Sequence, residues 1–533
     1  MKRSPSRAAK VLPALAAFAL AALGGLWQWN RPRIPPRPDI FLITVDTLRA
    51  DRLGSYGYGP ARTPALDRLA SEGTVFLQAT TPFPRTTPGL ASLLTGLWPL
   101  HHGSREVAQP LGEVTTLAEI LKARGYVTLA ASANGAASPH QKIDRGFDRF
   151  LDYRDLVPPI AEAVTAKTLE RVREVPAEEP LFLWMHTIDP HFPYTPPASW
   201  KDQPEAPECR RLMTELATDR WKIGEVQVDR NGVASAVLEE CSALYDAEIA
   251  YTDAEIGRFL EGLRAARRRP ALILFTSDHG ENLGEAGLFF EHGPSVHDAS
   301  LRVPLILVGD GIPARMDSDP VRLEDVVPTL LDLLGIPAKG RPAFDGVSFA
   351  HRLRPWRLPP PLRGRVPTAL AESGTSLLPN TFRWPFSGRA QDLHCLNSPE
   401  LSLCTKPGEE PRLYRPADDP RLEHDLREEL PQEYQVLLEA SERWVPEQVR
   451  ERTLRTHRFK LVEYPLWRGG YRSALYDLET DPGETRDVKA LFPSQFQDLS
   501  RRLGRFTALL PASGGDERTE EQLEALRALG YVQ

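Results

Sequence analysis

Three separated segments of the chain contain residue types that bind metal ions and activate hydroxyl groups. Asp46 follows an apolar run in the first segment, Thr86 begins the second, and Asp278 and His279 follow another apolar run in the third. Carboxylates and a neutral imidazole bind divalent cations, and a threonine hydroxyl beside such a cation becomes a nucleophile. These segments therefore predict a divalent-cation site next to a hydroxyl group.

The segment that begins at Thr86 also has the composition of a helix start. Thr86 and Thr87 precede a proline in the first turn, and the apolar run that follows stops at Gly96. In one interpretation, either hydroxyl only satisfies the orphan N–H groups of the first turn. In the other, one hydroxyl lies where helix amides converge on an anion, and it is a nucleophile.

The elements that must position these residues alternate along the chain. From Asp39 onward, short apolar runs alternate with amphipathic segments, which is typical of an α/β fold with a mostly parallel sheet. Ligand sites in such sheets form beyond the carboxyl ends of strands, where Asp46, His186, Asp189 and Asp278 are expected. The predicted strands cover residues 40–45, 127–131, 181–185, 271–275 and 304–308, and a helix is predicted over 244–263.

Length and composition indicate an ordinary globular protein with more than one domain. The chain has 533 residues, of which 41% are hydrophobic and 26% charged. A net charge of −7 gives no electrostatic reason to expect a nucleic-acid partner. Loops rich in proline and arginine begin near residue 344, so we predict a catalytic domain over 38–345 and a smaller α+β domain over 346–533, which ends in a helix over 517–532.

The first 37 residues differ from the rest of the chain. Four basic residues among the first ten precede an apolar segment over 11–27, which is the pattern of an export signal. No small-residue cleavage site follows it, and Trp27 and Trp29 would lie at a membrane interface. We expect residues 1–37 to be an uncleaved signal anchor and linker that tether an exported domain to the membrane. A cleaved signal peptide is the alternative.

The four cysteines suit an oxidising compartment, where they could form two disulfides. They are Cys209, Cys241, Cys395 and Cys404. The short loop between Cys395 and Cys404 favours that pair as a bridge. None has the CxxC spacing of a cysteine zinc site.

Long motifs of the chain resemble those of the sulfatase family of the alkaline phosphatase superfamily. VDTLRADRLGSYGY, over 45–58, is similar to the first metal segment of that family. TTPGLASLLTG, over 86–96, is similar to its nucleophile segment, and HTIDPHFPYTPP, over 186–197, to its substrate-histidine segment. The second metal segment resembles TSDHGENLGEAGLFFEHGPSVHDASLRVPLILVG over 276–309. The likeness covers nearly all of residues 38–533.

The resemblance implies a hydrolase of sulfuric or phosphoric esters that depends on one divalent metal ion. Asp46, Asp278 and His279 would bind the ion, and Thr86 would complete the ligand set. Because an imidazole joins carboxylates there, calcium, magnesium, manganese and zinc all stay open. The oligomeric state stays open as well.

The resemblance also assigns residues to the substrate. His191 and His292 would contact the sulfuryl or phosphoryl oxygens or protonate the leaving group, although either could be a plain loop residue. Arg49 would reach the anion or lie at the surface. The substrates implied are sulfated or phosphorylated small molecules, glycans or lipid headgroups.

Three departures from the family pattern bear on the reaction. The family has a cysteine or serine that is oxidised to formylglycine, where this chain has Thr86; Gly89 and Leu90 replace the usual Ser-Arg, and Thr47 replaces the second of two aspartates. Threonine cannot become formylglycine, because its β-carbon carries a methyl group. A phosphorylated threonine can be released by in-line attack of water more readily than a sulfated one. We therefore interpret Thr86 as the nucleophile and Thr87 as the cap.

Two other functions fit the same motifs. A membrane-tethered phosphoethanolamine-type transferase or a phosphodiesterase would also use a metal-bound threonine. A non-catalytic binding protein could keep the fold and the metal, and the loss of Ser-Arg after the nucleophile position motivates that alternative.

Overall fold

The structure is a computed structural model, in which some segments of the chain are not described. It describes residues 37–107, 109–154, 160–218, 233–293, 295–353, 369–373, 394–397, 401–405, 410–415, 419, 424–442, 450–465 and 471–507. The predicted anchor helix over 11–27 and the predicted terminal helix over 517–532 lie outside these residues. Among the described residues, no helix has the length and apolar character needed to cross a membrane.

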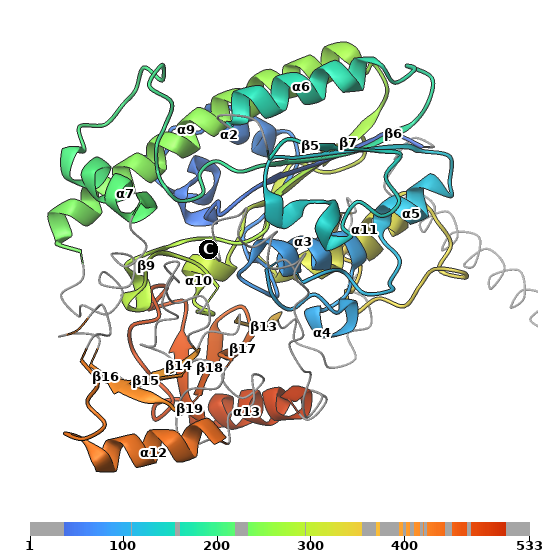
Figure 1. Cartoon of the computed structure of the whole chain (residues 1–533). Helices are drawn as coiled ribbons and strands as arrows, with labels where there is room; N and C mark the ends of the chain where they lie inside the picture. Colours follow the sequence, from blue (N-terminus) through green and yellow to red (C-terminus); the bar gives the residue numbers. More distant parts are fainter. Residues whose placement is uncertain are drawn as a thin grey trace, which may run out of the picture.

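An eight-stranded sheet forms the centre of the larger part of the molecule (Figure 1). Its strands stand in the order β11-β2-β10-β7-β1-β6-β4-β5. They are β1 (Asp39–Val45), β2 (Thr74–Phe76), β4 (Val127–Ser132), β5 (Arg149–Asp152), β6 (Leu181–Thr187), β7 (Ala271–Ser277), β10 (Leu305–Gly309) and β11 (Arg315–Asp317). Strands β7, β1, β6, β4 and β5 run parallel to their neighbours, so the predicted α/β class is confirmed.

One of the predicted strands, β10, runs against its neighbours. All five predicted strands form, but β10 pairs antiparallel with β7. No long crossover helix separates the two strands, because residues 278–304 fold into short elements at the edge where β7 ends. The chain therefore re-enters the sheet from the same edge and runs back along β7.

Helices cover both faces of this sheet, because its central strands are buried on both sides. From β1, Phe41 and Ile43 pack on one face and Ile40 and Leu42 on the other, as the alternation of a strand requires. The first face carries α2 (Pro64–Ser71), α6 (Ala161–Arg173) and α9 (Ser235–Ala266), which contains the predicted helix over 244–263. The second face carries α3 (Thr86–Thr95), α5 (Leu117–Lys122) and α11 (Val326–Leu333) (Figure 1).

The C-terminal part of the chain contains two small antiparallel sheets. The first has the order β13-β17-β18-β19, and the second has the order β14-β15-β16. Their strands are β13 (Ala369–Glu372), β14 (His394–Asn397), β15 (Ser402–Thr405), β16 (Arg412–Tyr414), β17 (Arg452–Arg455), β18 (Phe459–Pro465) and β19 (Tyr471–Asp477). Helix α13 (Pro493–Thr507) packs on the four-stranded sheet, and α12 (Pro431–Glu442) packs on the three-stranded one. The domain boundary predicted at residues 345 and 346 stays a prediction.

Disulfide bonds involve both halves of the chain. Cys209 of α7 (Pro207–Thr218) is bonded to Cys241 of α9, with 5.2 Å between their Cα atoms. Cys404 is disulfide-bonded as well, and the β14–β15 register sets Cys395 opposite it, as the favoured pairing requires.

Candidate active site

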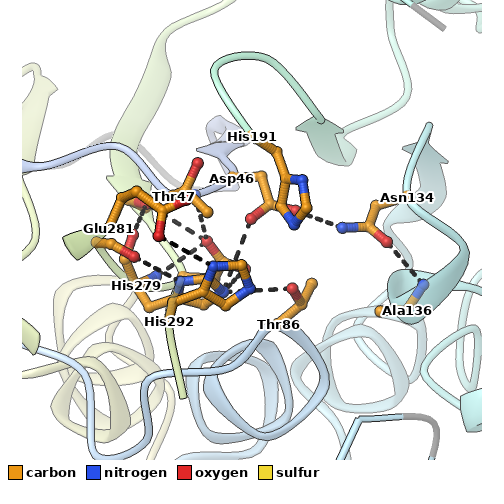
Figure 2. Close-up of polar contacts among 12 residues, drawn as sticks. Asp46, Thr47, Thr86, Asn134, Ala136, His191, His279, Glu281 and His292 are labelled. Carbon is orange, nitrogen blue, oxygen red and sulfur yellow. Dashed lines mark hydrogen bonds and ion pairs between the residues drawn. The ribbon is translucent and has the colours of Figure 1, made fainter. Parts of the chain in front are cut away.

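The candidate site lies beyond the carboxyl ends of four adjacent parallel strands. Asp278 follows β7, Asp46 follows β1, His186 lies near the end of β6, and Asn134 follows β4. The strand order β7-β1-β6-β4 brings these residues together, as expected for an open α/β sheet. Helix α3 begins on the other side of the group, so that the Thr86 hydroxyl faces His279 (Figure 2).

Asp46 and Asp278 form a buried pair of carboxylates. The Asp46 Oδ2 accepts a hydrogen bond from the Asn134 amide, and Asp278 Oδ1 accepts from the backbone N–H of Thr47 (3.3 Å) and His279 (2.9 Å). The second oxygens, Asp46 Oδ1 and Asp278 Oδ2, have no hydrogen-bond partner among the described residues. Two fully buried carboxylates with bare oxygens need a cation, so this pair fits a metal ion.

The pKa shifts of Asp46 and Asp278 also favour a bound cation. Burial alone would raise the pKa of Asp46, but its interactions with His186 and the other nearby imidazoles lower it. Burial, followed by the charge of Asp46, raises the pKa of Asp278. One carboxylate therefore favours the ionised form at the expense of the other, which is the behaviour of like charges without a counter-ion.

His279 presents a lone pair to this group. Its Nδ1 lies 2.9 Å from the carbonyl oxygen of Gly280, so Nδ1 carries the hydrogen and donates it. Its Nε2 then faces Asp278 Oδ2 at 3.3 Å, Asp46 Oδ1 at 3.7 Å and Thr86 Oγ1 at 3.3 Å. Burial lowers the pKa of His279, which favours the neutral imidazole that a metal ion requires.

His186 is a fifth candidate ligand, which the sequence analysis did not assign to the metal. Its Nε2 lies 3.5 Å from Asp46 Oδ2 and has no hydrogen-bond partner among the described residues. One ligand atom each from Asp46, His186 and Asp278 lie within 4.8 Å of one another. The signal was present in the sequence, because His186 follows a predicted strand, but nothing in the sequence shows that this strand pairs with β1.

Thr86 is buried in the first turn of α3, but the paired threonines do not cap the helix. Arg85 is the N-cap residue, and no side chain caps the helix there. The Thr87 hydroxyl instead donates to the carbonyl oxygen of Ala136 at 2.7 Å, so the prediction that Thr87 is the cap was wrong. The physical reason is that Ala136 lies in a buried turn after β4, where its carbonyl needs a donor.

Gly89, one of the departures from the family pattern, has a packing role. A Cβ atom at this position would lie 2.8 Å from the carbonyl oxygen of Asp278. Only glycine therefore lets the first turn of α3 approach Asp278 this closely. That contact holds the end bearing Thr86 against the metal group.

Both predicted substrate histidines lie beside the metal group. The His292 ring stacks on His279, with 4.4 Å between ring centroids, and His191 meets His292 edge-on at 5.1 Å. His191 Nδ1 lies 2.7 Å from the carbonyl oxygen of Phe192 and donates to it, so Nδ1 carries a hydrogen. Burial lowers the pKa of His292, whose Nδ1 lies 3.4 Å from Glu281 Oε1.

Thr47 is held in a strained conformation next to Asp46. Its φ of 53° is in the left-handed region, which is unfavourable for a β-branched residue. The Tyr245 hydroxyl donates to the Thr47 carbonyl at 2.6 Å, and the Thr47 N–H points to Asp278. Strain of this kind is found mostly at functional sites, where the surroundings enforce it.

Arg49 takes neither of the two expected positions. It is buried, and its guanidinium binds Asp51 at 2.8 Å and Glu285 at 2.7 Å. These carboxylates occupy its donors, so Arg49 is neither a surface group nor an anion-binding one.

Comparisons with known proteins agree with this fold. The fold is that of the alkaline phosphatase superfamily: a phosphonate monoester hydrolase of Agrobacterium radiobacter superposes with a TM-score of 0.61 and 21% identity, over 89% of this chain and 96% of that one. The family model Sulfatase matches residues 38–336, and the chain therefore belongs to the sulfatase family.

Individual relatives are distant in sequence. An arylsulfatase of Clostridium perfringens is 27% identical over 56% of this chain and 75% of the relative. Arylsulfatase K of Mus musculus is 26% identical over 60% of this chain and 65% of the relative. The chain thus spans just under two thirds of the mouse protein.

Proposed function

We propose that this protein is a metal-dependent hydrolase of sulfuric or phosphoric esters in which Thr86 is the nucleophile. The observation that carries the proposal is the position of Thr86 Oγ1, which is buried at the start of α3 and 3.3 Å from His279 Nε2. The same nitrogen lies 3.3 Å from Asp278 Oδ2 and 3.7 Å from Asp46 Oδ1, two carboxylate oxygens without a hydrogen-bond partner among the described residues. Membership of the sulfatase family supports an ester hydrolase.

The metal would be held by Asp46, Asp278 and His279 together with Thr86. His186 is the further imidazole within reach of the two carboxylates. A divalent cation bound there would lower the pKa of a hydroxyl ligand and neutralise anionic oxygens of the ester. The unpartnered carboxylate oxygens and the lone pair of His279 are the donors that such an ion requires.

The protein's own residues account for the rest of the reaction. Thr86 loses its hydroxyl proton to solvent, and its Oγ1 forms a bond to phosphorus or sulfur while the bond to the ester oxygen breaks. The departing oxygen takes a proton from His191 or His292, the two imidazoles next to the metal group. Water then attacks the esterified threonine and restores the Thr86 hydroxyl.

Threonine favours phosphorus as the target, because it cannot form the aldehyde hydrate that expels sulfate. The likeness to a phosphonate monoester hydrolase supports that choice, whereas sulfated substrates are named for several relatives. One similar structure holds D-glucosamine-2-N,6-O-disulfate, and similar proteins are named ulvan-active sulfatase in Formosa agariphila and choline-sulfatase in Rhizobium meliloti. Sulfated glycans and small sulfate esters therefore belong among the substrates to be tested.

The test is turnover of matched aryl sulfate, aryl phosphate and aryl phosphodiester substrates, and of a sulfated glycan, by the full-length protein and its variants. We expect Thr86→Val, which removes the hydroxyl at nearly constant volume, to lower kcat on the order of 100-fold or more. Thr87→Val is the matched control, and we expect it to stay within about threefold because the Thr87 hydroxyl donates to the carbonyl oxygen of Ala136 and has no role in the proposed reaction. Equal activity of the wild type and Thr86→Val would refute the assigned nucleophile.

We also propose that the protein is exported and tethered by residues 1–37. The disulfide between Cys209 and Cys241 supports an oxidising compartment. Fractionation should find the full-length chain with membranes, and a variant lacking residues 1–30 in the soluble fraction. A full-length chain found in the cytosol would contradict this proposal.

A further inference from the structure

Arg85 directly precedes the proposed nucleophile, and the mechanism above does not use it. Its backbone is extended (φ −147°, ψ 149°), because Arg85 is the N-cap residue of α3. Its side chain is 11% exposed. A cation therefore lies one residue from Thr86, at the end of the helix that faces the metal group.

The guanidinium of Arg85 lies against the residue that follows His292. A Cβ atom on Gly293 would be 2.4 Å from Arg85 Nε and 2.5 Å from Cζ. Gly293 also has a positive φ of 102°, which other residues rarely adopt. Both the backbone conformation and the nearby guanidinium therefore require glycine at this position. Arg85 is thus placed between the segment that carries Thr86 and the segment that carries His292.

Among the described residues, no carboxylate oxygen lies closer to the Arg85 guanidinium than 3.9 Å, which is long for a buried arginine. Its nearest acidic group is Glu106, with 3.9 Å between Arg85 Nε and Glu106 Oε2, and the buried Nε has no hydrogen-bond partner among the described residues. Two arginines nearby are paired more closely. Arg105 binds Glu372 at 2.8 Å, and Arg450 binds Glu106 at 3.1 Å.

A desolvated guanidinium without a close acceptor is costly, and an oxyanion is the partner that its planar donors fit best. We propose that Arg85 binds an anionic oxygen of the ester group that Thr86 attacks. The assignment rests on the proposed function, since it takes Thr86 as the point of attack. In the family pattern a Ser-Arg pair follows the nucleophile, where this chain has Gly89 and Leu90. Arg85 would supply a cation from the residue before the nucleophile instead.

The test compares Arg85→Gln and Arg85→Lys with the wild type, each saturated with the divalent cation that raises its melting temperature most. We expect Arg85→Gln to lower kcat/KM about 10- to 100-fold on a singly anionic aryl ester, the scale of a hydrogen bond to a charged group. It should weaken competitive inhibition by inorganic phosphate or sulfate by a similar factor. Arg85→Lys should fall between, because it keeps the charge but loses the planar donors.

Two control variants separate anion binding from a structural role. Arg105→Gln removes an arginine with the same 11% exposure that is already paired with Glu372, and should stay within about threefold of the wild type. Glu106→Gln removes the acidic neighbour of Arg85 while keeping the cation, and should do the same. If Glu106→Gln loses as much as Arg85→Gln, Arg85 acts through Glu106 and the proposal is wrong.

The substrate panel also identifies the oxygen that is bound. A loss confined to substrates with a second anionic group, such as a disulfated sugar, would overturn the assignment to the attacked ester.

Failure of this inference differs from failure of the proposed function. If Thr86→Val is inactive but Arg85→Gln matches the wild type, only the role of Arg85 is refuted. If no ester is cleaved at all, weaker binding of inorganic phosphate or sulfate by Arg85→Gln, measured by calorimetry, would still support an anion site.

Discussion

Asp46 and Asp278 decide whether the candidate site is stable without a metal ion. Both are buried, and each has one oxygen that no described residue neutralises. Like charges in a low-dielectric interior repel strongly, so the pair is expected to destabilise the fold until a cation binds. A ligand that binds only the folded state stabilises it by an amount that grows with the logarithm of the ratio of its concentration to its dissociation constant.

Replacing Asp278 with asparagine should therefore reverse the effect of metal on stability. With a chelator present, we expect Asp278→Asn to melt a few degrees above the wild type, because one charge of the buried pair is gone. With calcium, magnesium, manganese or zinc added, the wild type should gain stability and the variant should not. Thermal unfolding of both proteins in each metal checks this. A variant that is stabilised by the metal as much as the wild type would show that Asp278 is not a ligand.

The sequence predicts which residues belong to the site better than it predicts the contacts between them. The predicted residues Asp46, Thr86, Asp278, His279, His191 and His292 lie together in the structure. His186 was expected at a strand end but not assigned to the metal, and Asn134 was not singled out, because their places depend on the order in which β1, β6 and β4 stand in the sheet. Strand order is set by packing across the whole sheet, and a local pattern does not contain it.

At the scale of elements, the buried side chain of His102 forms a hydrogen bond to α3. The Ser104 N–H donates to Nδ1 of His102 at 3.2 Å, so Nε2 carries the hydrogen and meets the Ser92 hydroxyl of α3 at 3.0 Å. His102 ends α4 (Pro99–His102) and is fully buried. The sequence predicted the helix over 86–95 but not the contact between His102 and Ser92. His101 and His102 are adjacent, and only the folded turn decides which of the two side chains points toward α3.

This contact predicts how stability depends on pH. Burial lowers the pKa of His102 to about 3, below its value near 6.5 in an unfolded chain. The unfolded chain therefore binds more protons between these two values, and the stability due to neutral His102 is complete above pH 6.5 and is lost as the pH falls toward 3. Between pH 6.5 and 5 the loss from this group is about 1.5 kcal/mol.

His102→Gln keeps a polar side chain that does not titrate, so its stability should fall less steeply in the same range. Denaturant unfolding of the wild type and the variant at pH 6.5 and pH 5 measures the difference directly. The other histidines contribute equally to both proteins. Identical pH dependence in the two proteins would mean that His102 is not held neutral in the fold.

At the scale of the whole molecule, the C-terminal sheet supports the segment that carries His292. Lys460 of β18 is fully buried, and its Nζ lies 2.8 Å from Asp298 of α10 (Asp298–Leu301) and 2.5 Å from Glu484. Glu451, which precedes β17, accepts a hydrogen bond from the Val296 N–H at 3.1 Å. His292 thus lies against the metal group, and residues 296–298 are bonded to residues in and beside the four-stranded C-terminal sheet.

Lys460→Met should weaken both the fold and the reaction. It leaves Glu484 buried without its cation, and breaking such a pair on one side costs about 3 to 5 kcal/mol. Asp298 keeps Arg455, which lies 3.0 Å away, so α10 should loosen without unfolding. We expect kcat to fall several-fold, because His292 is placed by the segment that Asp298 ends, while inorganic phosphate or sulfate should bind nearly as well as in the wild type.

A second substitution distinguishes the lost pair from general damage to the core. Lys460→Met with Glu484→Gln removes the charge that the first change left unpaired, and should recover a large part of the unfolding free energy. It should not recover kcat, because Asp298 still lacks Lys460. A double variant no more stable than the single one would show that the buried charges are not coupled. A single variant that loses stability but keeps full kcat would show that the C-terminal sheet holds the molecule together without positioning His292.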